Sequence, residues 1–182
     1  HPTHTAGEKA ASRQATWLLL LEAAGVDLIL AGHNHVYERS YLLDNLTGNS
    51  ASITIANKID TLLGRIDVQH AYRKELGQPH QGTIFINCEG AGNSSKGTYV
   101  PVPNSFFPVV YKGDLNEGSL VIDVDGRNRM DVKFLCDEPN ASGSHVWDYF
   151  SIVKTQKATS VTRNANLLPR EFSVTNYPHP FN

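Results

Sequence analysis

Two histidines separated by one residue, His33 and His35, are the side chains of this sequence best suited to chemistry. They follow a short apolar run at residues 27–31 and a glycine, Gly32, in the string DLILAGHNHVYERS. A buried strand that stops at a glycine presents its next side chains at its carboxyl end, which is the edge of an open α/β sheet where ligands bind. Imidazole nitrogens are good ligands for zinc, iron and manganese. The pattern therefore predicts a metal site in which the two rings bind one ion or two adjacent ions.

An isolated His-x-His pair has an ordinary alternative, in which both rings are surface or hydrogen-bonded side chains. The surrounding string favours the metal site, because AGHNHVYERS resembles the GHxH block of calcineurin-like metallophosphoesterases, and its YERS continuation is most similar to the purple acid phosphatase branch. The resemblance implies hydrolysis of a phosphate ester at a binuclear centre of two metal ions (Fe, Zn or Mn), with His33 on one ion and His35 on the other. It also implies that Tyr37 and Arg39 line the rim, with Tyr37 as a substrate contact, although packing is the ordinary role for both.

The opening residues resemble a second block of that superfamily, the HxP or HHPP motif that shortly precedes GHxH. In that motif the histidine two places before the proline usually binds metal, but here only His1 precedes Pro2. The third histidine ligand is therefore either His1 in a compressed motif or a residue just before it, and we expect the chain to begin within a domain. His4 either faces substrate or is simply a polar loop residue.

The superfamily's DxH, GDxxD and GNHE or GNHD blocks, which precede GHxH, are absent from this sequence. KGDLNEG, which contains Asp114 and Glu117, resembles GDxxD in its residue types. We reject the match, because the string follows GHxH and no strand leads into it. We therefore expect the missing segment to supply the bridging aspartate. We also expect this chain alone to lack a complete binuclear site and measurable activity.

A helix and a strand must position the histidines. Apolar residues recur at helical spacing over residues 8–24, so one face is expected to pack on a sheet, with Trp17 and Leu20 widening that face. Gly25 is placed to end the helix as its C′ residue. Helix, glycine, strand and histidine turn together make half of an α/β unit.

Further strands are predicted from alternating or apolar runs, at residues 52–56, 82–88, 119–124, 130–135 and 146–154. In the last of these, Trp147, Tyr149 and Ile152 are expected on the apolar side. Asp125-Gly126 is a hairpin signal, whereas residues 57–81 show no clean period and predict an insertion or a long loop. The predicted fold class is α/β (α+β). The resemblance makes it the C-terminal part of a metallophosphoesterase four-layer α/β/β/α sandwich, with mostly antiparallel strands after the GHNH loop.

Three parts are expected along the chain: residues 1–154 as the C-terminal portion of the metallophosphoesterase domain, 155–170 as a polar linker, and 171–182 as a tail. The tail string FSVTNYPHPFN resembles the opening of the C-terminal sorting domain used by the type IX secretion system. That resemblance implies the secretion machinery as a partner and a secreted or cell-surface location in a bacterium. Cys88 and Cys136 lie in separate predicted strands, and they permit one disulfide without requiring it.

Composition limits the other classes of function. The 182 residues are 40% hydrophobic and 19% charged, as in an ordinary soluble globular protein. A formal net charge of −2 argues against a nucleic-acid binder that works by neutralising phosphates. No apolar run approaches the length needed to span a membrane. The alternative to a hydrolase is a secreted binding or adhesion module whose histidine site is structural or vestigial.

Overall fold

The computed structural model describes residues 8–32, 37–46, 53–60, 63–64, 70–88, 109–110, 118–137 and 144–156. Its elements in chain order are α1 (Glu8–Ala23), β1 (Leu28–Ala31), β2 (Tyr37–Arg39), β3 (Leu42–Leu43), the 3₁₀ helix η2 (Ile55–Asn57), β4 (Lys58–Asp60), β5 (Ala71–Glu75), β6 (Ile84–Cys88), β7 (Val109–Val110), β8 (Gly118–Asp125), β9 (Arg129–Asp137) and β10 (Ser144–Thr155).

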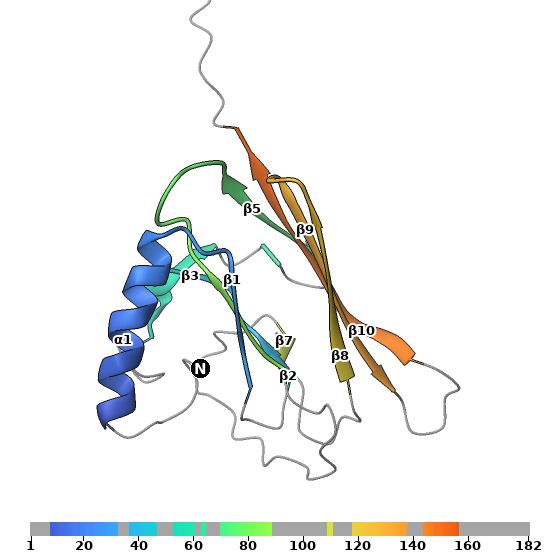
Figure 1. Cartoon of the computed structure of the whole chain (residues 1–182), viewed down its shortest axis with the longest axis horizontal. Helices are drawn as coiled ribbons and strands as arrows, with labels where there is room; N and C mark the ends of the chain where they lie inside the picture. Colours follow the sequence, from blue (N-terminus) through green and yellow to red (C-terminus); the bar gives the residue numbers. More distant parts are fainter. Residues whose placement is uncertain are drawn as a thin grey trace, which may run out of the picture.

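Helix α1 and two four-stranded sheets form three successive layers (Figure 1). In the first sheet, ordered β1-β6-β2-β7, β1 runs parallel to β6, and β2 is antiparallel to β6 and β7. In the second sheet, ordered β5-β10-β9-β8, only β5 and β10 are parallel. This mixed α/β arrangement, with mostly antiparallel pairs after the GHNH segment, is the predicted fold class. The described residues contain three of the four expected layers.

Helix α1 ends as its sequence predicts. Gly25 has φ of +73°, a conformation that a glycine adopts without steric cost. Its N–H donates to the Glu22 carbonyl (3.0 Å), and the Val26 N–H donates to the Leu21 carbonyl (3.0 Å). These two bonds define a Schellman motif, which satisfies the last carbonyls of the helix and turns the chain into β1.

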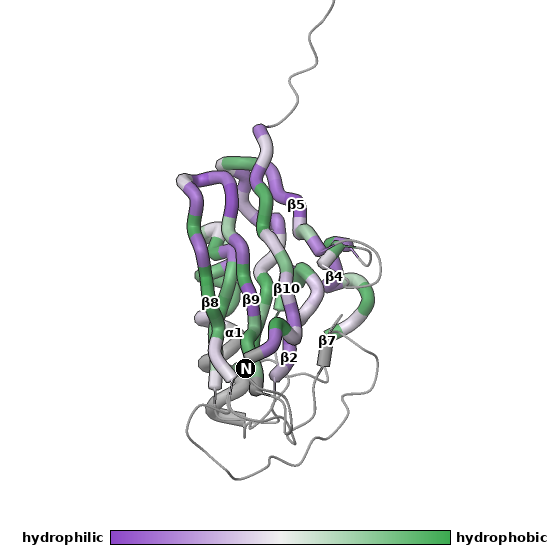
Figure 2. Tube along the Cα trace, turned by 90° about the vertical axis from the view of Figure 1, so that its right-hand side faces the viewer, coloured by the Kyte–Doolittle hydropathy of each residue, from purple (hydrophilic) through white to green (hydrophobic). Residues whose placement is uncertain are grey.

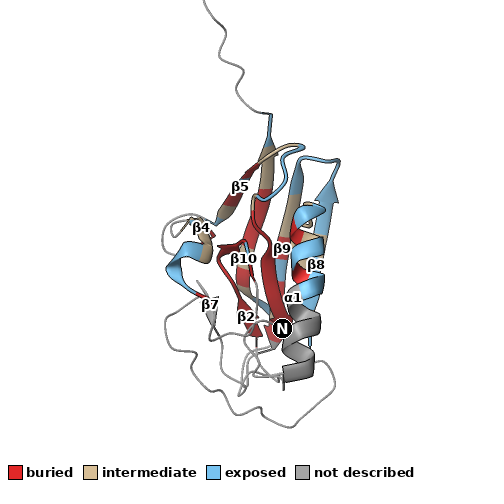
Figure 3. Cartoon of the chain, turned by 90° about the vertical axis from the view of Figure 1, so that its left-hand side faces the viewer, coloured by how far each residue is buried: buried red, intermediate tan, exposed pale blue. Residues whose placement is uncertain are grey.

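The buried face of α1 is narrower than expected. Leu18 and Glu22 lie four residues apart, hence on one face, and they are only 7% and 2% exposed. Trp17 and Leu20, predicted to widen this face, are instead 65% and 58% exposed. Both lie away from the buried stripe, on the solvent side of the helix, which Figure 3 shows in pale blue. The prediction that these two residues belong to the core is therefore wrong.

Glu22 ties the helix to the chain that follows β3. Its carboxylate accepts hydrogen bonds from the backbone N–H groups of Asn45 (2.9 Å) and Leu46 (3.3 Å). Burial raises the pKa of this carboxyl, and the nearby Asp44 adds to the effect, whereas the two N–H donors oppose it. The contact holds α1 against the first sheet at the end opposite to the carboxyl end of β1.

Strand β6 is covered on both faces, so the structure has two cores. Phe85 packs towards the helix, whereas Ile84 and Ile86 pack between the sheets. Burial on both faces explains why this strand begins with three consecutive apolar residues, 84–86. The core between the sheets contains Tyr37, Leu42, Tyr72, Ile84, Ile86, Val132, Phe134, Cys136, Phe150 and Ile152.

Strands β8, β9 and β10 show the expected alternation of polar and apolar residues along each strand (Figure 2). The predicted hairpin is confirmed, with Gly126 at φ of +58° between β8 and β9. In β10 the pairing shifts between Val146 and Asp148, and beyond this bulge Phe150 faces the core. Tyr149 was predicted on the apolar side, but its hydroxyl contacts Asp131 and Ser151, so that assignment is wrong.

The strand predicted at residues 52–56 is not formed, because the chain enters the 3₁₀ helix η2 there. The Asn57 side chain explains this change. Its Oδ1 accepts from the Thr54 N–H (2.8 Å), and its Nδ2 donates to the carbonyls of Asp44 (3.0 Å) and Asn45 (2.9 Å). Such local bonds between a side chain and the backbone favour a turn over a strand.

Residues 57–81 were predicted as an insertion or a long loop, but they contain β4 and β5. Strand β5 pairs in parallel with β10, which lies far along the sequence, with Ala71 opposite Ser151. Its inward residues are Tyr72 and Lys74, so a charged side chain interrupts the apolar pattern. The prediction failed because the signal for this strand is long-range pairing.

We expect the core between the sheets to dominate stability. Val132 on β9 is completely buried, whereas Val124 on the neighbouring strand β8 is 64% exposed. Val132→Ala should lower the free energy of unfolding by about 2 kcal/mol, because buried methyl groups are lost and a cavity remains. Val124→Ala, the matched control, should change it by less than about 0.5 kcal/mol. Urea denaturation measures both, and equal effects would contradict the position of the core.

Candidate functional site

The candidate site is the edge of the first sheet at which the parallel strands β1 and β6 end. Strand β1 stops at Ala31 and β6 stops at Cys88, and the chain re-enters the sheet as β2 at Tyr37. The connection between β1 and β2 carries the GHNH string. A connection at the carboxyl end of a parallel strand is where α/β sheets place ligand-binding side chains.

The predicted ligands His1, His33 and His35, and the predicted substrate contact His4, lie outside the described residues. Their roles therefore stay predictions. Within the ranges that the structure describes, no group of three or more His, Cys, Asp or Glu side chains could hold a metal ion. The sequence predicts imidazole ligands in the connection between β1 and β2, and imidazole chemistry suits the iron, zinc or manganese that the sequence implies.

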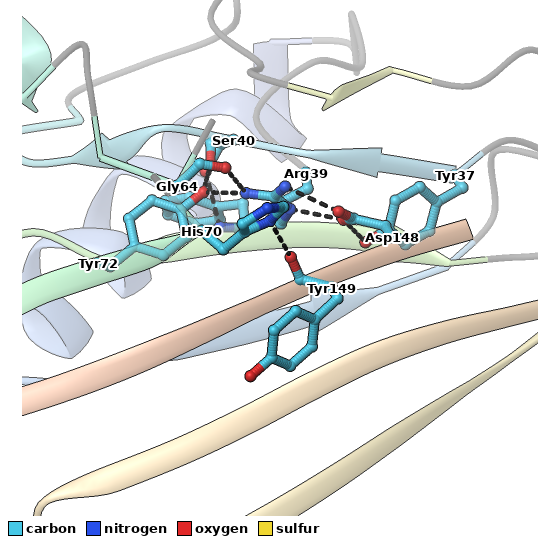
Figure 4. A network of polar contacts seen from close by, with 9 residues as sticks. Tyr37, Arg39, Ser40, Gly64, His70, Tyr72, Asp148 and Tyr149 are labelled. Carbon is cyan, nitrogen blue, oxygen red and sulfur yellow. Dashed lines mark hydrogen bonds and ion pairs between the residues drawn. The ribbon is translucent and has the colours of Figure 1, made fainter. Parts of the chain in front are cut away.

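A buried ion pair lies directly after this connection and joins the two sheets (Figure 4). Arg39 on β2 is 0% exposed, and it binds both carboxylate oxygens of Asp148 on β10. The Arg39 Nε donates to Oδ2 (2.6 Å) and Nη2 donates to Oδ1 (2.9 Å). Its Nη1 donates to the Gly64 carbonyl (2.6 Å) and to the Tyr72 hydroxyl (2.6 Å). Every nitrogen of the guanidinium therefore has an acceptor, which a buried cation requires.

Tyr37 completes the network from the same strand, two residues before Arg39. Its hydroxyl donates to Asp148 Oδ2 (2.5 Å), and its ring stacks on Phe134 at 4.2 Å between centroids. It is 1% exposed, and Arg39 is likewise buried and not at a rim. Packing between the sheets accounts for both residues. The predicted contact between Tyr37 and a substrate stays a prediction.

Burial and the charges of this network together determine its protonation. Burial alone would lower the pKa of the Arg39 guanidinium, but Tyr72, Asp148 and Tyr37 together raise it, so the cation persists. Burial raises the pKa of the Tyr37 hydroxyl well above its ordinary value, and the Asp148 charge adds to this. Burial also raises the pKa of Tyr72 to about 12, against the opposing effect of Arg39. Both phenols therefore remain neutral donors at physiological pH.

A second charged cluster joins the sheets at their other end. Asp27, just before β1, accepts from Lys74 of β5 (2.7 Å) and pairs with Lys154 of β10 (2.5 Å). Lys74 also donates to the Gly82 carbonyl (2.7 Å). Burial lowers the pKa of Lys74, although the bond to Asp27 opposes that shift. Both ends of β1 therefore lie near contacts that set the position of one sheet against the other.

Sequence reasoning identified Arg39 and Tyr37 but missed their partners Asp148 and Tyr72. The available signals were a single aspartate in a mostly apolar strand, WDYFSIV, and a tyrosine followed by three charged residues, YRKE. An acidic residue at an inward strand position predicts a buried cationic partner. Which residue is that partner depends on the tertiary structure, because Arg39 and Asp148 lie far apart in the sequence.

No protein-family model and no curated protein matches this chain. Among solved structures, the chain is similar to a purple acid phosphatase isolated from seeds of yellow lupin (Lupinus luteus), with a TM-score of 0.52 and 19% identity. The similarity covers 75% of this chain and 19% of the lupin protein, so the chain spans about a fifth of that phosphatase. At this identity the comparison shows the fold, which is consistent with the C-terminal part of a purple acid phosphatase. Among the helices that the structure describes, none is long and apolar enough to cross a membrane.

The Gly64 backbone should be indispensable to the ion-pair network. Gly64 has φ of +77°, and a Cβ there would lie 2.1 Å from Cζ of Tyr72. Gly77 has a similar φ of +73° but open space around it. Both Gly→Ala changes impose about 1–2 kcal/mol of backbone strain. Gly64→Ala should cost at least about 2 kcal/mol more, because Tyr72 must move away from Arg39. Chemical denaturation checks this, and equal losses would show that the network tolerates displacement.

Tyr72 should make the protein sensitive to alkaline pH. The folded chain keeps the phenolic proton up to about pH 12, whereas an unfolded tyrosine loses it near about pH 10. The free energy of unfolding should therefore be unaffected by this group below about pH 10 and should fall between about pH 10 and 12, by on the order of 2–3 kcal/mol. Urea midpoints across this range should fall less steeply in Tyr72→Phe. Parallel curves for the two proteins would contradict the raised pKa.

Proposed function

We propose that this chain is part of a metal-dependent phosphoester hydrolase of the acid phosphatase or phosphodiesterase type. The observation that carries the proposal is the position of the GHNH string, in the connection that leaves the carboxyl end of β1, within a fold similar to that of a purple acid phosphatase. The fold alone is shared by proteins of differing function, so the motif and its position supply the argument for chemistry.

The proposed roles follow from what a phosphate ester requires. Two bound metal ions would supply a water ionised near neutral pH and positive charge for the phosphoryl oxygens. His33 would bind one ion and His35 the other, while His1 or a residue just before it would be the third histidine ligand. His4 would face the substrate. Tyr37 and Arg39 would act chiefly by anchoring β2, the strand that the histidine connection enters.

We further propose that the complete site needs an upstream segment that carries the bridging aspartate. Two observations support this: the chain spans 19% of the lupin phosphatase, and β1 is at the edge of its sheet among the described strands, where its Leu30 is 52% exposed. An additional strand beside β1 would cover Leu30 and bring further ligands to the same edge. The chain alone should then bind metal weakly and lack activity.

The proposed location is outside a bacterial cell or on its surface. Its support is the tail string FSVTNYPHPFN at residues 172–182, which would engage a secretion machinery. The preceding residues 155–170 would serve as a linker. Most of this segment falls beyond residue 156, where the described part of the chain ends, so the proposal depends on sequence resemblance.

The activity can be tested by expressing the chain together with its upstream sequence. We expect hydrolysis of a chromogenic phosphate ester in the presence of Mn, Fe or Zn, and a loss of at least about 100-fold in His33→Ala and in His35→Ala, because each removes a metal ligand. His70→Ala is the matched control, since that ring is exposed and lies beside the Tyr149 carbonyl (3.1 Å). Metal content should fall together with activity in the first two variants only.

Calorimetric titration of the 182-residue chain separates the proposals. Weak or absent binding is expected if upstream ligands are required, and tight binding of two ions per chain would show that they are dispensable. If the chain expressed with its upstream sequence is stable but binds no metal and is inactive, the result would instead favour a binding or adhesion module with a vestigial histidine site.

A further inference from the structure

The only two cysteines of the sequence lie in the same core between the sheets. Cys88 ends β6 in the first sheet, and Cys136 lies near the end of β9 in the second. Both are present as thiols and are not joined. Cys136 is 1% exposed, whereas Cys88 is half-buried, so solvent reaches the pair from one side.

The strand registers place the two thiols at the same level of the sandwich. Cys88 is directly opposite Tyr37 in the β2–β6 pair, so their side chains share a face. Tyr37 stacks on Phe134 across the interface, at 4.2 Å between centroids. Cys136 follows Phe134 by two residues and therefore faces the same way. The stacked rings thus hold the two cysteine-bearing strands against each other, with one thiol beside each ring.

Small residues allow a close approach here. Gly118 on β8 is opposite Cys136, and a Cβ at that position would lie 2.4 Å from the Phe134 ring. The absence of a side chain lets this ring lie against β8 and stack on Tyr37. Strands β6 and β8 are also in contact across the interface between the sheets.

We infer that Cys88 and Cys136 are an oxidisable pair, which closes to a disulfide between the two sheets. The bond would anchor β6 to β9 next to Tyr37, the first described residue after the histidine connection. The inference stands on the thiols alone and does not require the proposed phosphatase activity. It would apply in an oxidising compartment, where such bonds persist.

The chemistry is thiol–disulfide exchange with a small disulfide oxidant, such as oxidised glutathione. The Cys88 thiolate attacks one sulfur of the oxidant, a mixed disulfide forms, and one glutathione thiolate leaves. The Cys136 thiolate then attacks the Cys88 sulfur, forms the Cys88–Cys136 bond and releases the second glutathione. The protein loses two electrons and two protons, and the two glutathione thiols receive them. Cys88 is the first to react because it is the more exposed.

Exchange should be slow at neutral pH. Burial raises the pKa of the Cys88 thiol to about 11, and the neighbouring Cys136 adds to this. The thiolate is the attacking form, so the rate should rise about tenfold per pH unit between about pH 7 and 9.

The test is to incubate the folded 182-residue chain with oxidised glutathione at about pH 8.5 and to follow intact mass, thiol content and melting temperature. The expected product is a monomer that has lost two hydrogen atoms, with a proteolytic peptide that links Cys88 to Cys136. Its melting temperature should rise by on the order of 5 °C, and a reductant should reverse the change.

Cys88→Ser is the matched control, since serine is tolerated at a half-buried position and Cys136 should then stay a thiol with no gain in melting temperature. Three outcomes would overturn the inference for the parent chain: retention of both thiols, a stable glutathione adduct at Cys88 without ring closure, or a bond between two chains. Each would show that the pair does not close to a disulfide in the folded protein.

Discussion

The contact on which the rest of this structure depends is the ion pair between Arg39 and Asp148. A guanidinium with no exposed surface loses its hydration, and this cost is offset only when each of its nitrogens is satisfied by an acceptor. Here a bidentate carboxylate, the Gly64 carbonyl and the Tyr72 hydroxyl provide that satisfaction. A shift of β2 by one residue would turn the Arg39 side chain to the opposite face of its sheet. The ion pair is therefore compatible with only one pairing register of β2.

This constraint acts together with an apolar core and a second charged cluster. The ring of Phe150 lies 4.7 Å from the Arg39 guanidinium carbon, so the cation contacts aromatic surface as well as its acceptors. At the other end of the interface, Asp27 holds Lys74 and Lys154. Apolar burial supplies most of the stability, while the two charged clusters determine how the sheets are aligned. A sheet edge held in this way is a rigid support for the connection that enters β2.

The similarity to a purple acid phosphatase and the GHNH string contribute different parts of the functional argument. The former shows an arrangement of layers at 19% identity, and the latter names residues suited to metal ligation. The buried network links them, because Tyr37 and Arg39 of the YERS string hold β2 in the interface immediately after the two histidines. The YERS residues therefore have a physical role in positioning the edge, whatever reaction occurs there.

The sequence by itself determined the local features, namely the helix ended by Gly25, the apolar strand β6 and the Asp125-Gly126 hairpin, because each depends on residues close together in the chain. It also identified His33 and His35 as candidate ligands from their type and spacing. Only the tertiary structure decided that Trp17 and Leu20 face solvent, that β5 joins β10, and that Arg39 is buried against Asp148. Those outcomes depend on contacts between segments far apart in sequence. In β5 and β10 a charged inward residue, Lys74 and Asp148 respectively, interrupts the apolar pattern by which buried strands are recognised.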